Sequence, residues 1–198
     1  MILLVVLAAF VIYWLTRSKT ARVREAKQGP IALQTHTETF NRSIEKLMNA
    51  YHEIKNAFVD ADTARAKSNT TSFIQLLDSI PLQELQKDTS MIFESATSTV
   101  NDIKSNAHSL LQQTDITEMR KDFSMVTEML YPAFFKTINY EGPAMYLQHC
   151  PMAFDGDKGA NWISKNMEVI NPYLGKNHPK YKGTMLNCGE ILDTIKSN

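Results

Sequence analysis

The spacing of apolar residues between positions 40 and 58 constrains the fold most. These residues recur at intervals of 4, 3, 4, 3 and 4 positions: Phe40, Ile44, Leu47, Tyr51, Ile54 and Phe58. Because an α-helix completes a turn in about 3.6 residues, these intervals place all six side chains on one face. The stretch therefore predicts an amphipathic helix, which must bury that face against other elements.

Similar apolar patterns recur three times before residue 138. A second helix is predicted to run to about residue 78, before Pro81, and a third begins near residue 88. A fourth begins at Asp115, which precedes Glu118 by three residues, as in a capping box. Four helices with short connections are typical of an antiparallel four-helix bundle. We therefore predict a mainly α fold, with this helical bundle over residues 35–138 acting as a scaffold.

The N-terminal segment has a different character. An uninterrupted apolar run covers residues 2–15 and contains Tyr13 and Trp14 near its end, as in an interfacial belt. We predict a transmembrane or signal anchor over residues 1–16 and a basic linker over residues 17–34. A cleaved signal peptide and a buried core helix are the alternatives. The basic linker favours a cytoplasmic domain by the positive-inside rule, whereas a basic segment further upstream would reverse this, so the orientation stays open.

The helical pattern is lost after residue 138. Six of the seven glycines and four of the seven prolines lie in residues 139–198. Such turn-forming residues predict a loop-rich C-terminal Cys/Met lobe, closed by a short helix over about residues 189–196. The aromatic residues Phe154, Trp162 and Tyr173 are predicted to form a small core of this lobe. The sequence "NPYLG" predicts a tight turn in which Gly175 has a positive φ.

Both cysteines lie in the predicted lobe, and each has a methionine nearby. Pro151 restricts Cys150 to extended backbone, so Cys150 and Met152 are expected to point to the same side of a strand. Met185 and Cys188 are three residues apart, on one face of a helical turn. Cys188 and Gly189 begin the predicted last helix. A thiol at a helix N-terminus has a lowered pKa, so the Cys188 thiolate is favoured. These four sulfur ligands would suit Cu(I), and would not suit Mg, Ca or Mn.

Two histidines complete the predicted metal site. His149 would point to the opposite face of the strand from Cys150, and His178 is a freer outer ligand. The alternative is a disulfide between Cys150 and Cys188, because cysteines in a loop-rich exported domain often pair. The methionines would then fill gaps in the core. Two unrelated thiols are a third interpretation.

The motifs "HCPMAF", "GANWIS", "INPYLG" and "MLNCGEI" resemble a bacterial envelope domain. That domain is found alone or at the C-terminus of periplasmic adaptor subunits of copper and silver efflux systems. The "HCPM" core is also similar to the Cys-Pro-Met signature of small heavy-metal-binding modules attached to copper pumps. The resemblance covers about residues 145–195 and implies a helical bundle with a metal-linked lobe. It carries over to Cys150, Met152, Met185 and Cys188. The segment "KNHPKYKG" is an insertion relative to the compact form, and lengthens the reach between the two half-sites.

We therefore expect a membrane-anchored envelope protein that binds Cu(I), or a similar soft ion, for holding or transfer to efflux or assembly machinery. It would be anchored in the inner membrane with its soluble domain in the periplasm, and would not be an enzyme. The expected partners are the membrane and a copper efflux adaptor or another envelope protein. Nucleic acid is not expected, because 21 basic and 21 acidic residues leave no net charge.

The alternative function is that of a structural or interaction subunit of an envelope complex. Its lobe would be locked by a disulfide between Cys150 and Cys188. Tyr146, Trp162 and Tyr173 would then be presented to a partner protein.

Overall fold

The described chain consists of four long helices and a small sheet. The computed structural model describes residues 35–154 and 157–196. The predicted anchor over residues 1–16 and the basic linker over residues 17–34 lie outside this part. Within the described residues, no helix has the length and apolar character needed to cross a membrane.

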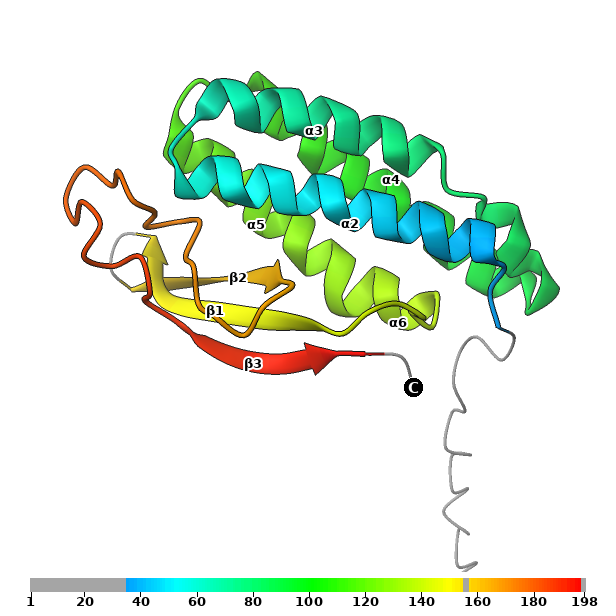
Figure 1. Ribbon diagram of the computed structural model, residues 1–198. Coiled ribbons are helices and arrows are strands. Elements are labelled where there is room, and N and C mark those ends of the chain that lie inside the picture. The colour runs from blue at the N-terminus through cyan, green and yellow to red at the C-terminus, as the bar shows by residue number, and fades with distance from the viewer. Residues whose placement is uncertain (1–34, 155–156, 197–198) are drawn as a thin grey trace, which may run out of the picture.

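The helices pack in the order of the sequence, each against the next (Figure 1). Their bounds are α2 (Glu38–Val59), α3 (Thr63–Asp78), α4 (Ser90–Gln112) and α5 (Ile116–Glu128). A 3-10 helix, η1 (Leu82–Lys87), joins α3 to α4, while the short helices η2 (Met129–Phe134) and α6 (Phe135–Thr137) follow α5. The prediction of a mainly helical chain is confirmed.

Side-chain caps fix where the long helices begin. The four N-cap residues are Thr37, Asp62, Thr89 and Asp115. The Asp115 carboxylate accepts hydrogen bonds from the backbone N–H groups of Thr117 at 2.8 Å and Glu118 at 3.1 Å. Since these donors stabilise the charged form, they lower the pKa of Asp115. The predicted start of the fourth helix at Asp115 is confirmed.

The C-terminal region contains a three-stranded antiparallel sheet, which the sequence did not predict. Its strands are β1 (Met145–Phe154), β2 (Lys158–Ser164) and β3 (Glu190–Ile195), in the order β2-β1-β3. The predicted helix over residues 189–196 is therefore wrong. Six residues are too few for periodicity to separate a strand from a helix, and hydrogen bonding to β1 selects the strand.

The sheet and the helices share one hydrophobic core. The predicted aromatic core of the lobe forms around Tyr173, whose ring centroid lies 5.2 Å from that of Phe154 and 6.0 Å from that of Trp162. It is not separate, however, because Tyr173 also lies 6.3 Å from Phe123 of α5. Phe123 in turn stacks on Tyr51 of α2 at 4.9 Å. The sheet therefore depends on the helices for its packing.

Candidate functional site

The structure brings the two cysteines together from segments 38 residues apart. Cys150 lies in the central strand β1, opposite Ala160 of β2, and its side chain is fully buried. Cys188 lies just before β3 and is partly exposed. Both are free thiols, and their Sγ atoms are 2.9 Å apart. This contact is the central feature of the candidate site.

A close backbone approach at Gly189 places Cys188 beside β1. Gly189 has a φ of +144°, and a Cβ atom there would lie 2.6 Å from the His149 carbonyl oxygen and 2.9 Å from Trp162 Cη2. Real Cβ atoms do not occupy such positions, so glycine is required for this approach. The next residue, Glu190, pairs with His149 and begins β3. Cys188, just before β3, is thereby held beside β1, the strand that contains Cys150.

Asn171, from the "NPYLG" segment, fixes the turn that carries Cys188. Its fully buried side chain donates from Nδ2 to the Cys188 carbonyl oxygen at 2.8 Å. Its Oδ1 accepts from the backbone N–H groups of Tyr173 and Leu174 at 2.8 and 3.0 Å. Gly175 has a φ of +45°, as predicted for this turn. The sequence analysis found the turn but missed its role, although an Asn before Pro was a visible signal.

The environment of Cys188 differs from that predicted. Burial, and then the contact with Cys150, raise the pKa of the Cys188 thiol to about 11. The prediction of a lowered pKa at a helix N-terminus is wrong, because Cys188 precedes a strand and gains nothing from a helix dipole. At neutral pH the Cys188 thiol is therefore protonated, and a metal ion would have to displace its proton.

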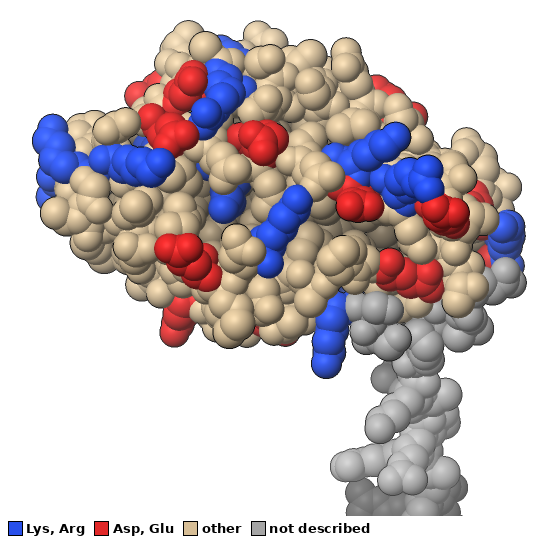
Figure 2. Space-filling view, in the orientation of Figure 1, with Lys and Arg blue, Asp and Glu red and all other residues tan. Residues whose placement is uncertain are grey.

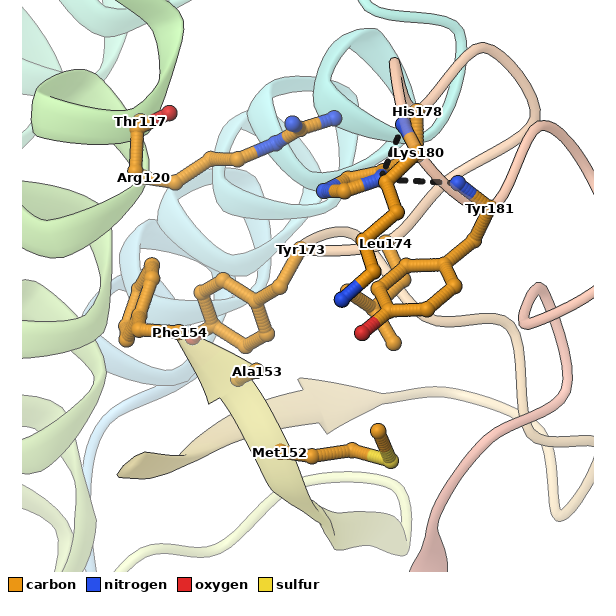
Figure 3. Close-up of a pocket in the computed structure, with 10 residues that line it drawn as sticks. All are labelled: Thr117, Arg120, Met152, Ala153, Phe154, Tyr173, Leu174, His178, Lys180 and Tyr181. Carbon is orange, nitrogen blue, oxygen red and sulfur yellow. Dashed lines mark hydrogen bonds between the residues drawn. The ribbon is translucent and has the colours of Figure 1, made fainter. Parts of the chain in front are cut away.

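The histidines and methionines of the predicted site lie in different surroundings. His149 points to the other face of β1 from Cys150, as expected, and its Nδ1–H donates to the Asn161 side-chain oxygen at 2.7 Å. Met152 follows in the extended β1, where it lines a cavity, and His178 lies at the other end of that cavity (Figure 3). Met185 is partly buried against the core, and its carbonyl oxygen accepts from the Cys188 N–H at 3.0 Å.

The structure thus brings the two predicted thiol ligands into contact. In the part of the chain that the structure describes, no group of three or more His, Cys, Asp or Glu side chains gathers to hold a metal ion. The pair of thiols is nevertheless a chemically reactive arrangement. It can bind a soft ion, or it can be oxidised to a disulfide.

The sequence analysis also missed Arg120, which lines the same cavity as Met152 and His178. It is four residues after Ile116 and three before Phe123, so it falls on the apolar face of α5. A charged residue on the apolar face of a predicted helix was the signal in the sequence that could have identified it. The side chain is only 3% exposed.

Comparison with known proteins matches the helical part of the chain. Residues 47–140 match the family DUF3347, described as a protein of unknown function. The match covers helical segments from α2 to α6 and ends before β1, which carries the Cys-Pro-Met motif. Comparison with curated proteins and with solved structures gives no match. The match is thus a similarity to a domain of unknown function, and it assigns no role to the chain.

Proposed function

We propose that this protein is a membrane-tethered envelope protein that binds Cu(I), or a similar soft ion, through Cys150 and Cys188. The observation that carries the proposal is the 2.9 Å contact between their sulfur atoms. Thiolates are soft ligands and favour Cu(I) over the hard ions Mg, Ca and Mn. Both thiols would release their protons as the ion binds.

The geometry fits an ion after a small opening of the thiol pair. Metal–thiolate bonds are about 2.3 Å long, so two sulfurs that share an ion are about 4 Å apart. The pair at 2.9 Å must then open by about 1 Å. The Cys188 side chain is the one expected to rotate, because it is partly exposed, whereas Cys150 is buried in the central strand. Met152 and Met185 are partly buried against the same core and supply thioethers in the proposal.

The cellular setting is part of the same proposal. The apolar run over residues 2–15 supports a tether in the inner membrane, and the resemblance of residues 145–195 to copper efflux adaptor domains supports a periplasmic location. The protein would hold the ion, or pass it to efflux or assembly machinery, without a catalytic step. Basic and acidic side chains are interspersed on the face shown in Figure 2, in keeping with partners other than nucleic acid.

A Cu(I) competition titration against a chromogenic chelator tests the thiol site. The reduced protein is expected to withdraw one ion per chain from the chelator. Cys150→Ser and Cys188→Ser should each abolish this withdrawal, because a hydroxyl cannot replace a thiolate ligand. Met152→Leu and Met185→Leu should weaken it and keep the fold, since leucine conserves size and apolarity. His149→Ala should have the smallest effect.

Met167→Leu is the matched control, because Met167 lies in the same C-terminal region but is 64% exposed. Its affinity for Cu(I) should equal that of the wild type. A reduced wild-type protein that withdraws no copper from the chelator contradicts the proposal.

The second candidate function is a structural subunit locked by a disulfide. The full burial of Cys150 and the fixed Cys188 turn favour it, since a pair of touching thiols held in this way can be oxidised with little rearrangement. The predicted partner surface needs revision, however, because Trp162 and Tyr173 are 0% and 1% exposed. Measuring the intact mass without reductant distinguishes the two functions. A mass lower than that of the reduced chain by two hydrogen atoms, with no copper uptake after reduction, favours the disulfide-locked structural subunit.

Membrane fractionation tests the tether. The full chain is expected to stay with the membrane after carbonate extraction, because the apolar run over residues 2–15 would lie in the bilayer. A chain lacking residues 1–16 is the control and should appear in the soluble fraction. Release of the full chain with an intact N-terminus contradicts the tether.

A further inference from the structure

The cavity beside the end of β1 has the composition of an anion-binding site. Its volume is about 330 Å³, and it lies between the start of α5, the last residues of β1 and the segment that follows Tyr173 (Figure 3). Three of its lining residues are basic: Arg120, His178 and Lys180. Among the described residues that line it, none is acidic.

Arg120 provides a buried donor without a partner. Its Nη2 donates to the Phe58 carbonyl oxygen at 2.7 Å, which ties it to the end of α2. Its Nε is buried and has no hydrogen-bond partner among the described residues. Burial lowers the pKa of Arg120 to about 10, although the negative charge of Asp115 opposes the shift, so the guanidinium stays charged at neutral pH. A buried cation in this state is stabilised by an incoming anion.

His178 and Lys180 add donors at the same cavity. The His178 Nδ1 accepts the backbone N–H groups of Lys180 and Tyr181, both at 3.2 Å. In the neutral ring the proton therefore lies on Nε2, which is a donor. Figure 3 shows the Arg120 and His178 side chains extending toward one another, while the Lys180 side chain runs away from them and places its Nζ 5.0 Å from the centroid of the Tyr181 ring. The polar part of the cavity thus offers N–H groups and positive charge.

The remaining walls are apolar and determine the class of anion. The apolar part of the cavity lining includes three side chains: Met152, Phe154 and Leu174. A ligand that fills both parts needs an oxyanion at one end and a hydrocarbon body at the other. We propose that this cavity binds a small organic carboxylate, with its charged group at Arg120 and its apolar part against Met152 and Leu174.

This anion site binds a different kind of ligand from the thiol pair, and it is tested by a different experiment. Anion binding needs no metal, so it is measured on metal-free, reduced protein. Cys188→Ser should abolish Cu(I) binding and leave carboxylate binding unchanged, because Cys188 does not line the cavity. Failure of one proposal therefore leaves the other intact.

Benzoate is a suitable probe, and benzamide is its neutral isostere. In an NMR titration of the full chain in nanodiscs, benzoate should shift the Arg120 Nε–H resonance with saturation, and benzamide should not. Arg120→Gln, followed through backbone amides of the cavity, should lower the affinity for benzoate by roughly tenfold or more, because charge-assisted hydrogen bonds are lost.

Arg120→Gln also removes the bond to the Phe58 carbonyl oxygen, so Lys180→Gln provides an independent variant. It removes one charge at the rim and should lower the affinity roughly threefold, with a weaker effect at high salt. Lys182→Gln is the matched control, since Lys182 lies in the same segment but does not line the cavity; its affinity should not change. The proposal is overturned by no saturable response to benzoate, by equal responses to benzamide or sulfate, or by equal losses in Lys180→Gln and Lys182→Gln.

Discussion

Replacing Gly189 with alanine is expected to lower the free energy of unfolding by about 3–5 kcal/mol and to separate the two thiols. The added Cβ would lie 2.6 Å from a carbonyl oxygen of β1 and 2.9 Å from the ring of Trp162. Neither can yield easily, because the first belongs to the central strand and Trp162 is fully buried. The φ of +144° is also one that alanine rarely adopts. Relief therefore requires the start of β3 to move, and Cys188 with it.

Urea unfolding followed by circular dichroism measures the loss of stability, and the chelator titration measures the loss of Cu(I) affinity. Gly183→Ala is the matched control, because the nearest atom to its added Cβ is the Lys176 carbonyl oxygen at 3.5 Å, an ordinary contact. We expect it to change stability by less than about 1 kcal/mol. If Gly189→Ala kept wild-type stability and copper affinity, the close approach would not be what positions Cys188.

Phe123→Ala is expected to destabilise the whole described fold by about 3–5 kcal/mol. Phe123 is fully buried in α5, where its ring contacts those of Tyr51 at 4.9 Å and Phe58 at 5.3 Å. Its ring centroid also lies 6.3 Å from that of Tyr173, which packs against Phe154 of β1 and Trp162 of β2. Its removal leaves a cavity where the helices meet the C-terminal region. Helices and sheet should therefore lose stability together.

The measurement compares two probes of urea unfolding, far-ultraviolet circular dichroism for the helices and tryptophan fluorescence for β2. The fluorescence is measured in a Trp14→Phe background, so that it reports on Trp162 of β2. Both midpoints should fall by the same amount in Phe123→Ala. Met125→Ala, on the same helix but 45% exposed, is the control and should cost less than about 1 kcal/mol. A shift confined to one probe would indicate two separate cores.

The sequence alone predicted the helices, because the information that specifies them is local. Apolar residues at intervals of three and four mark the buried face of α2, and Asp115 marks the start of α5 by capping N–H groups two and three residues ahead. The turn at Gly175 follows from its neighbours in the same way. Each of these features needs only a few adjacent residues to form.

The tertiary structure decided the features that depend on distant partners. Residues 190–195 form a strand because β1 supplies their hydrogen bonds, although their own pattern also suited a helix. The contact between Cys150 and Cys188 depends on the fit of Gly189 against β1, which spacing along the chain does not encode. Arg120 likewise became part of a cavity only when α5 met the end of β1. Sequence periodicity specifies which face of an element is buried, whereas packing determines what that face meets.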